Sequence, residues 1–470
     1  MVDLRERRGL LRTLLAPVGV LAALLVIYWV AAPRLVSLSP APDEIGVAPD
    51  QPIELHFNRA MDAASVQSRF TVNPNVAGHW RWQDDTARYE PVGTWPEGGT
   101  VAVNLAPGAR SSLFLPMLGG QAWTFEIIKP RIAYLASSRG RSVLMGRALD
   151  GAEPQPLIGA STDVEAYDFG TDGSLATIER IAEGDSIVRW RPGLDEAPVD
   201  LHRCPSTLQC SAVAVSPSAS WVAWQQRPTQ RSETGIVNLG PGSIWVATTS
   251  METPAQPLTS SLSNLLSPTW PGSEILAVLD IDGEALHLFQ DEADRWLEAT
   301  DPIPHPLGEQ WTWSPDGRFV VLPEVVFTPV DPTAAGQVGF FSHLYRVEVA
   351  SGLRTDLSRV EAGMVEDASP AYSPDGLTIA FARKSLVLDQ WTFGRQIWVM
   401  RADGSGSRQL TEVGNRNHAH LRWSPDGKRL AYVLFDATNP NRPSEVWWLD
   451  VASGETSELV AGGFEPEWIP

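Results

Sequence analysis

Few residues of this chain have the type and spacing that a metal-binding or catalytic motif requires. Its two cysteines, Cys204 and Cys210, are six positions apart, and without a second pair they cannot supply the four ligands of a structural zinc site. Two thiols flanking one short loop suit a local disulfide in an oxidising compartment, and two unpaired thiols are the alternative. His418 and His420 alternate along the chain and could share a strand face. No third ligand accompanies them, so we expect no metal site.

The common catalytic motifs are missing from the sequence. It contains no Gly-x-Ser-x-Gly nucleophile elbow, no His-Glu-x-x-His pair and no phosphate loop of the Walker type. Aspartate and glutamate are abundant, so composition alone does not locate two carboxylates that would act as acid and base. We therefore expect no enzyme and no cofactor.

A turn motif with an aromatic in front organises the second part of the chain. It reads Trp313-Ser-Pro-Asp-Gly317, Tyr372-Ser-Pro-Asp-Gly376 and Trp423-Ser-Pro-Asp-Gly427, each followed by an apolar strand. Degenerate copies place further anchor positions at 169, 215, 270 and 468. A strand-based repeat of roughly 40–60 residues predicts a ring of small sheets, a β-propeller, and seven anchors predict seven blades.

The final repeat is incomplete. It stops at Pro470, just after the anchor Trp468, while an unassigned apolar strand, Arg131-Ile-Ala-Tyr-Leu135, stands at the start of the region. We expect the C-terminal strand to be the innermost strand of the first blade. The two ends of the ring would then pair and leave no exposed sheet edge.

These repeats resemble the TolB-like propeller repeat. The resemblance implies a propeller over residues 130–470. TolB itself is a periplasmic, protein-binding propeller preceded by a different domain, and similar blades occur in the propellers of prolyl-oligopeptidase-type peptidases. Protein binding is therefore the activity that the resemblance favours.

Residues 35–129 alternate in strand fashion. Ile53–Phe57, Val101–Leu105 and Trp123–Ile127 are short strands separated by proline and glycine, which predicts a β-sandwich. The segments Phe57-Asn-Arg-Ala-Met-Asp62 and Tyr89-Glu-Pro91, with the closing Trp123-Thr-Phe125, resemble the bacterial Ig-like domain of surface-layer and other envelope proteins. That resemblance implies a spacer or adhesion unit.

The N-terminal segment suits a membrane anchor. Leu14 to Ala32 is an uninterrupted apolar stretch of 19 residues, close to the ~20 that cross a bilayer core. Four arginines precede it, so residues 1–34 should form a cytoplasmic basic stub and a single transmembrane helix, with the bulk of the chain outside the cell membrane. A cleaved signal peptide ending near Val30-Ala31-Ala32 is the alternative. Either interpretation exports the remainder.

The charge balance limits the partners. The formal net charge is −20, from 56 acidic and 36 basic residues. A surface this acidic repels nucleic-acid phosphates and anionic lipid, so we expect no nucleic-acid ligand. The membrane contact that we expect is made by the N-terminal helix.

Long loops between second and third strands should crowd one rim of the propeller, opposite the Ser-Pro-Asp-Gly turns. They are Gln225–Gly242, Leu322–Ser342, Ala382–Arg395 and Leu434–Ser444. The aromatics on or beside them are Phe327, Phe340, Phe341, Trp391, Phe393 and Phe435. Grouped aromatics on one rim would bind a protein or peptide; the alternative is that they extend the blade cores.

Together these observations predict an all-β chain with one N-terminal transmembrane helix, an Ig-like β-sandwich and a seven-bladed propeller. The expected function is that of a membrane-anchored extracytoplasmic scaffold or binding protein. The alternative is an envelope hydrolase or lyase with carboxylates in the propeller channel. Several ionisable side chains converging in that channel, with perturbed pKa values, would favour the enzyme.

Overall fold

The computed structural model describes residues 32–470, except 48, 50, 139, 182–183, 233–234, 252, 259–260, 273–274, 293–294, 307, 330–337, 360–363, 388 and 440. The predicted membrane anchor, residues 14–32, therefore lies outside the described residues apart from its last position. No helix in the described part has the length and apolar character needed to cross a bilayer. The chain divides into two compact units, Met1–Pro130 and Arg131–Pro470.

The first unit consists of two four-stranded sheets around one core. The first sheet has the order β1 (Leu35–Ser39), β3 (Ile53–Phe57), β6 (Thr86–Pro91), β5 (Gly78–Gln83). The second has the order β2 (Glu44–Val47), β8 (Gln121–Ile127), β7 (Thr100–Leu105), β4 (Phe70–Asn73). In β3 the alternate residues Ile53, Leu55 and Phe57 point into the core, which is the period-2 pattern of a half-buried strand. The short helix α2 (Ala63–Gln67) begins where Asp62 accepts a hydrogen bond from the Ser65 amide at 2.7 Å.

The second unit is built of four-stranded antiparallel blades. Blade 1 is β38 (Gly463–Trp468), β9 (Arg131–Ser138), β10 (Arg141–Ala148), β11 (Gln155–Pro156). Blade 2 is β12 (Asp163–Phe169), β13 (Leu175–Arg180), β14 (Ser186–Arg191), β15 (Val199–Cys204). Blade 3 is β16 (Leu208–Val215), β17 (Trp221–Ser232), β19 (Ser243–Thr248), β20 (Gln256–Pro257), with β18 (Gly235–Asn238) paired to β17. Blade 4 is β21 (Leu265–Gly272), β22 (Ile275–Asp280), β23 (Ala285–Asp291), β24 (Trp296–Glu298), with β25 (Ile303–Pro304) paired to β23.

Blades 5 and 6 form one eight-stranded sheet, because a single bridge between Ser342 and Glu366 joins them. Their strands are β26 (Thr312–Trp313), β27 (Phe319–Pro329), β28 (Val338–Glu348), β29 (Arg354–Asp356), and β30 (Val365–Tyr372), β31 (Thr378–Ser385), β32 (Gln396–Arg401), β33 (Arg408–Gln409). Blade 7 is β34 (Arg416–Trp423), β35 (Arg429–Asp436), β36 (Glu445–Asp450), β37 (Thr456–Ala461).

Each apolar cluster of this unit is shared by two consecutive blades. Leu286 of blade 4, for example, packs in one cluster with Val320 and Leu322 of blade 5. The same holds around the ring, and the last cluster joins Val446 of blade 7 to Tyr134 of blade 1. A single blade has two apolar faces and cannot bury them alone, so neighbour packing closes the described blades into a propeller-like ring.

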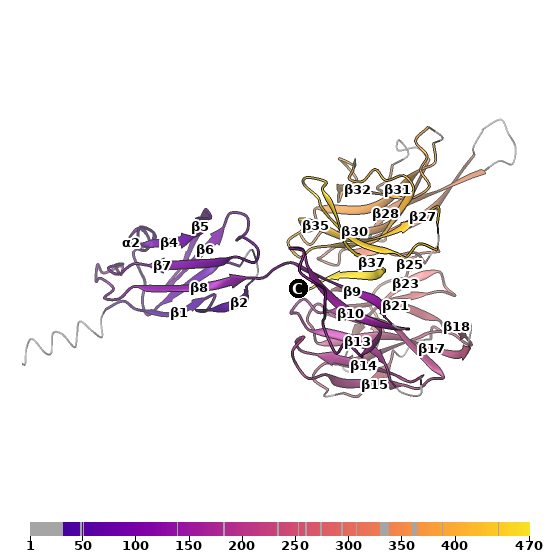
Figure 1. Ribbon diagram of the computed structural model, residues 1–470, viewed down its shortest axis with the longest axis horizontal. Coiled ribbons are helices and arrows are strands. Elements are labelled where there is room, and N and C mark those ends of the chain that lie inside the picture. The colour runs from indigo at the N-terminus through magenta and orange to yellow at the C-terminus, as the bar shows by residue number, and fades with distance from the viewer. Residues whose placement is uncertain are drawn as a thin grey trace, which may run out of the picture. The chain divides into compact units, whose positions relative to one another are not determined.

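The two ends of this unit pair with each other. β38 runs antiparallel to β9, with Phe464 opposite Leu135 and Trp468 opposite Ile132. In Figure 1 the yellow C-terminal strands and the purple β9 lie side by side although they are more than 300 residues apart. The C-terminal strand therefore covers an edge of β9 that would otherwise be open.

Each Ser-Pro-Asp-Gly turn is held by its own side chains. The Ser314 hydroxyl donates to the Asp316 carboxylate at 2.6 Å and accepts from the Phe319 amide at 2.9 Å. The same two bonds recur at Ser373 and Ser424. The closing glycines have positive φ, which a residue without a side chain adopts at least cost.

The anchor aromatics join the blades by hydrogen bonds as well as by packing. The Trp423 indole donates to the Ala371 carbonyl of the preceding blade at 2.9 Å, and Trp270 and Trp468 donate to the carbonyls of Ala214 and Arg422 in the same way. These contacts satisfy buried indole N–H groups at the blade interfaces, where an unpaired donor would be costly.

The first prediction compares two glycines with the same backbone angle. Gly317 and Gly427 both have a φ of +67°. A Cβ on Gly427 has its nearest neighbour at 3.7 Å, whereas one on Gly317 would lie 2.4 Å from the Pro271 carbonyl oxygen. We expect Gly427→Ala to lower the free energy of unfolding by about 1–2 kcal/mol and Gly317→Ala to lower it by clearly more. Urea denaturation of both variants measures this, and equal losses would contradict the structure of the Gly317 turn.

The second prediction concerns Ala219, which occupies the glycine position of a degenerate turn with a φ of +54°. Because an alanine is strained in this region, Ala219→Gly should leave the fold intact and raise the free energy of unfolding by about 0.5–1 kcal/mol. The urea midpoint is the measurement. A loss of stability would show that the turn does not need a positive φ at this position.

Candidate functional site

The first strands of neighbouring blades contact one another at five of the seven junctions between blades, so they are the innermost strands of the ring. The contacting pairs are β12 and β16, β16 and β21, β26 and β30, β30 and β34, and β34 and β38. In each repeat we compare the residues that stand one and three positions before the anchor aromatic. The residues one before the anchor are Asp168, Ala214, Thr269, Thr312, Ala371, Arg422 and Glu467, and those three before it are Ala166, Ala212, Ser267, Gln310, Ser369, His420 and Glu465. The ionisable members all belong to blades 7, 1 and 2. We call Tyr167, Asp168, His420, Arg422, Glu465 and Glu467 the axial cluster.

A carboxyl pair forms the centre of the axial cluster. Asp168 on β12 and Glu467 on β38 lie close enough for each carboxyl group to affect the pKa of the other. Asp168 also accepts a hydrogen bond from the Val215 amide at 2.6 Å. Burial raises the pKa of Asp168 to about 6, and burial together with the nearby Asp168 raises the pKa of Glu467 well above its ordinary value. The two neighbouring carboxyls therefore bind protons more tightly than ordinary carboxyls do.

The other members of the axial cluster set its charge. The positive charge of Arg422 lowers the pKa of both paired carboxyls and so opposes the effect of burial. Burial raises the pKa of Glu465, while burial and then Arg422 lower the pKa of His420. Side chains of His420, Arg422 and Glu465 remain exposed to solvent, so the axial cluster is open to a ligand.

The chemistry available here is proton transfer and the binding of charged groups. A carboxyl pair that shares a proton can donate one from one group and accept one at the other. Among the described residues no group of three or more histidine, cysteine or acidic side chains has the arrangement of a metal site.

The two histidines of β34 do not share a strand face. A bulge between Ala419 and Arg422 and a positive φ of 53° at His420 break the alternation. His418 is buried, its Nδ1 lies 2.7 Å from the Arg395 carbonyl oxygen, and burial lowers its pKa to about 4. His420 instead joins the axial cluster, so the idea of a common histidine face is wrong.

The loop aromatics divide into three groups. Trp391, Phe393 and Phe435 are exposed by 41%, 59% and 38%. Phe341 is buried and belongs to the blade. Phe327 and Phe340 stand opposite each other in the backbone register of β27 and β28, and their side chains lie outside the described part of the structure.

Trp391 and Phe393 contact each other, and backbone bonds hold their loop near the strand that carries Phe435. The rings of Trp391 and Phe393 are 4.6 Å apart in an edge contact, and the Lys384 ammonium lies 4.9 Å from the Trp391 ring. The Gly394 amide bonds to the Gly414 carbonyl, which ties this loop to the link before blade 7. The Arg395 amide bonds to Asn417, which stands opposite Phe435. We call Val387, Trp391, Phe393, Val413 and Phe435 the rim patch.

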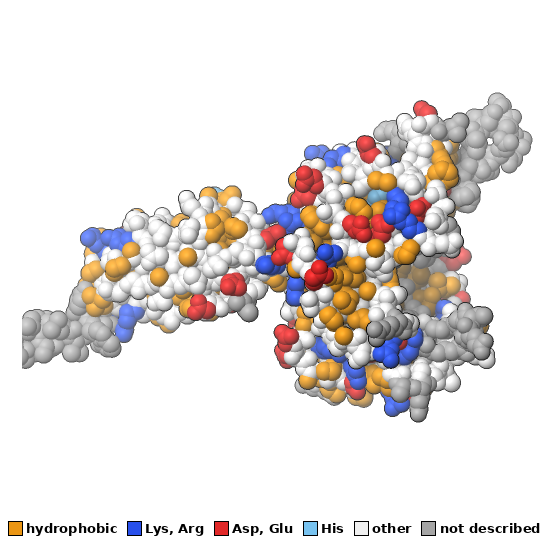
Figure 2. All heavy atoms as spheres, in the orientation of Figure 1, with side chains coloured by type: hydrophobic (Ala, Val, Ile, Leu, Met, Phe, Trp, Pro, Cys, Tyr) orange, Lys and Arg blue, Asp and Glu red, His pale blue; other side chains and the backbone are white. Residues whose placement is uncertain are grey.

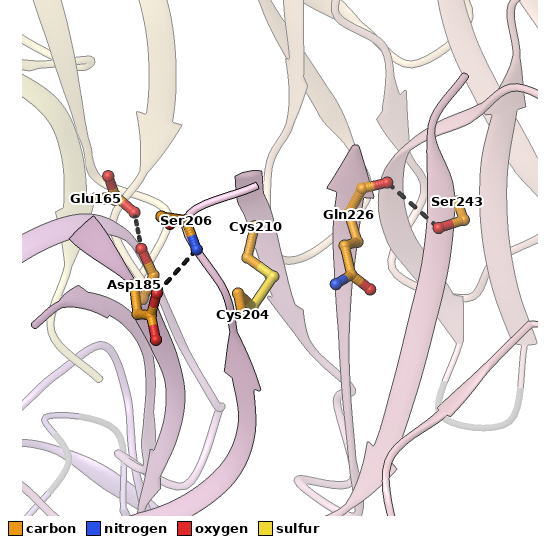
Figure 3. Close-up of a disulfide and its surroundings, with 8 residues drawn as sticks. Glu165, Asp185, Cys204, Ser206, Cys210, Gln226 and Ser243 are labelled. Carbon is orange, nitrogen blue, oxygen red and sulfur yellow. Dashed lines mark hydrogen bonds between the residues drawn. A yellow bond between two sulfur atoms is a disulfide. The ribbon is translucent and has the colours of Figure 1, made fainter. Parts of the chain in front are cut away.

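The cysteines flank the link between blades 2 and 3, with Cys204 at the end of β15 and Cys210 within β16. Cys204 and Cys210 are joined in a disulfide and are both buried, in the apolar cluster that those blades share. Figure 3 shows the bond beside Asp185, which accepts a hydrogen bond from the Ser206 amide at 2.9 Å. The disulfide thus fixes the link that follows β15.

Charged side chains are dispersed on the face that Figure 2 shows. In the view of Figure 2, acidic and basic side chains are interspersed over both units and no large area of one sign stands out. On the face in view, charge spread in this way favours solubility more than the steering of one charged partner.

Sequence reasoning missed the axial cluster. Its members have different side chains and are distant in sequence, so no motif marks them. The available signal was positional: in an alignment of the seven repeats, the residue before the anchor is neutral in four copies and ionisable at Asp168, Arg422 and Glu467.

Comparison with known proteins gives a family match for the first unit. Residues 30–126 match the model of the bacterial Ig-like domain family. A 110-residue stretch is 26% identical to an uncharacterized peptidase of Bacillus subtilis, YuxL, and covers 23% of this chain and 16% of that protein. The match therefore spans about a sixth of the relative's length.

Two solved structures align with this chain. A puromycin-hydrolyzing peptidase of Mycobacterium tuberculosis aligns with a TM-score of 0.50 at 15% identity, over 73% of this chain and 55% of that chain. TolB from Acinetobacter baumannii aligns with a TM-score of 0.39 at 12% identity, over 93% of this chain and 99% of that chain. The chain carries an N-terminal bacterial Ig-like domain followed by a β-propeller that is similar in fold to part of the puromycin-hydrolyzing peptidase.

Proposed function

We propose that this protein is a membrane-tethered, extracytoplasmic binding module. Its propeller holds a protein or peptide partner on the rim patch, and its Ig-like unit serves as the spacer. The observation that carries this proposal is the exposure of Trp391 and Phe393 side by side on one loop. Large aromatic side chains grouped at the surface expose apolar area to water, which does not stabilise a monomer. Such residues contribute much of the binding energy of protein interfaces.

The position of the rim patch supports the same function. Its residues come from the loop after β31, the link between blades 6 and 7 and the end of β35, which share one rim of the ring. The chain enters the ring at the start of β9, which in antiparallel order lies on the rim of the Ser-Pro-Asp-Gly turns. A partner on the loop rim would therefore approach the side away from the entering chain.

Export is supported by two features of different kinds. The N-terminal apolar stretch follows four arginines, which suits an anchor with the bulk of the chain outside. The Cys204–Cys210 disulfide suits an oxidising compartment, since cytosolic thiols are kept reduced.

The test is site-specific photo-crosslinking of the full-length protein in membranes. A photoreactive residue at Phe393 should give one discrete adduct, and Trp391→Ser should reduce it at least tenfold by weakening the rim patch. The matched control places the photoreactive residue at Leu377, which is 68% exposed on the opposite rim, and should give no adduct. Equal labelling from both rims would contradict a docking surface at the loops.

A second candidate function has its own supporting observation. The axial cluster brings together the converging ionisable groups, with shifted pKa values, that we named as the sign of an enzyme. The similar peptidases favour a hydrolase, but this chain spans only part of each, and its sequence has no nucleophile elbow. In this candidate function Asp168 and Glu467 would act as acid and base.

The enzyme candidate makes a sharp prediction. Purified protein incubated with pools of envelope-type peptides and glycans should cleave at least one, and Asp168→Asn and Glu467→Gln should each lower the rate by at least a hundredfold, since general acid–base groups contribute about 10²–10⁴. Glu458→Gln, an exposed acidic residue on β37, is the control and should retain full rate. Product mass spectrometry provides the readout. Cleavage that survives both substitutions would eliminate the carboxyl pair as its source.

A further inference from the structure

The loop between β7 and β8 of the Ig-like unit exposes large apolar side chains. Leu113 is 73% exposed and Phe114 is 72% exposed, the highest values among the large hydrophobic residues that the structure describes. Leu118 on the same loop is exposed as well. Exposed apolar side chains grouped in this way do not stabilise a monomer and are typical of a contact surface.

The fold holds this loop in an ordered conformation. The Ser111 amide donates to the Leu115 carbonyl at 2.9 Å, and the Phe114 amide donates to the Ser111 carbonyl at 2.8 Å. The Met117 amide donates to the Ala109 carbonyl at 2.6 Å, and both of these residues are buried. Phe114 has a φ of +62°, a conformation that is strained for a residue with a bulky side chain. The loop therefore presents an aromatic ring to its surroundings at a cost in backbone energy.

The same loop lies beside the residues at which the Ig-like unit begins. Residues 32–35 and 117–121 line one hollow of about 280 Å³. The Arg34 amide donates to the Asn58 side chain at 2.8 Å, and the Asn58 side chain donates to the Ala32 carbonyl at 3.3 Å. Ala32 is buried, and the family match begins at residue 30. The unit therefore begins at Ala32 without a free linker after it.

This position matters because Ala32 is also the last residue of the apolar stretch Leu14–Ala32. If that stretch crosses the bilayer, it ends at a residue that is itself fixed within the Ig-like unit. The end of the unit that carries Leu113 and Phe114 then lies at the lipid surface. In Figures 1 and 2 this end is the left end of the first unit, near α2, and hydrophobic and basic side chains gather there on the visible face.

We propose that the β7–β8 loop is a second membrane contact, which inserts Leu113, Phe114 and Leu118 into the interfacial region of the bilayer beside the anchor. An insertion depth of about 5–10 Å is typical of apolar side chains that lie in this region. The contact seats the Ig-like unit on the lipid surface. The inference rests on the membrane tether of the proposed function and adds lipid as a ligand of the folded domain.

Charge at this end is close to balance among the described residues. Arginines stand at the strand ends and on the loop itself: Arg34, Arg59, Arg69 and Arg110. Asp62 caps α2 by accepting from the Ser65 amide, and Asp84 and Asp85 form the turn between β5 and β6. The arginines can bind lipid phosphates, but apolar burial drives the contact, so uncharged phosphatidylcholine is a sufficient partner.

Fluorescence quenching by lipid tests the insertion on the full chain in phosphatidylcholine vesicles. The two natural cysteines are joined in a buried disulfide, so Leu118→Cys offers one site for an environment-sensitive fluorophore. Its emission should shift to the blue and be largely lost when the vesicles contain lipids that carry a nitroxide near the headgroup. The matched control is Val92→Cys, also exposed and following the six-residue strand β6. It lies roughly 20 Å from the lipid end and should show neither effect.

Substitution of the tip separates insertion from mere proximity. Leu113→Asp combined with Phe114→Asp places charges at two exposed positions, and aspartate tolerates a positive φ better than phenylalanine does. Quenching at position 118 should fall to the level found at position 92. Val92→Asp in the Leu118→Cys chain is the control and should leave the quenching unchanged. Undiminished quenching in the double variant would overturn insertion by Leu113 and Phe114.

Extraction of the same vesicles with alkaline carbonate distinguishes this inference from the tether on which it rests. A chain that stays in the membrane while position 118 is not quenched would overturn the lipid contact and leave the tether standing. Release of the chain would overturn both. A blue shift without quenching would place the loop against protein instead of lipid, which would also overturn the proposal.

Discussion

The structure depends on the pairing of β38 with β9. A blade of this unit has two apolar faces, and each face is buried only against the next blade. The last seam exists because the chain end returns to the strand at which the ring begins. Without it, an edge of β9 and the apolar residues around Tyr134 would lose their cover. Stability is therefore a property of the whole ring, and one strand completes it.

The same seam carries the ionisable residues near the axis. Asp168, Arg422 and Glu467 come from the three blades that meet where the chain ends, whereas the equivalent positions of the other four blades carry alanine or threonine. Holding a carboxyl pair in this place is costly at neutral pH, because burial disfavours the charged forms. Perturbed groups of this kind are more common at functional sites than in a purely structural interface. The rim patch offers a second, apolar surface on the loop rim.

Much of the fold follows from local chemistry and could be predicted. Ser-Pro-Asp-Gly turns and anchor aromatics define the blades because each motif makes its own hydrogen bonds, as Ser314 and Trp423 do. The repeat pattern leaves Arg131–Leu135 as an unassigned strand and leaves the last repeat incomplete. These two observations predicted that the C-terminal strand pairs with Arg131–Leu135, as it does. In the first unit, the alternation of apolar and polar residues in Ile53–Phe57 predicted a strand, which is β3 of the first sheet. The match of residues 30–126 gives the family of this unit, the bacterial Ig-like domain.

The candidate site was less accessible to sequence reasoning. Its residues are juxtaposed by ring closure, which no local pattern encodes. The bulges of the inner strands also carry ordinary residues such as Ser369 and His420 in the left-handed region, where glycine would have been the visible signal. For this reason His418 and His420 could be expected on one face although the bulge separates them. The sequence located the loop aromatics, but it could not tell which of them are exposed. Tertiary packing decides this: Phe393 is exposed and Phe341 is buried.

Removal of the C-terminal strand tests the central claim most directly. A chain ending at Gly462 lacks β38, and its unfolding in urea can be compared with that of the full chain. The account predicts that the propeller loses its cooperative transition or unfolds at a much lower urea concentration, and that a synthetic peptide of residues 463–470 restores the transition when added. An unchanged midpoint in the shortened chain would contradict a ring closed by its C-terminal strand.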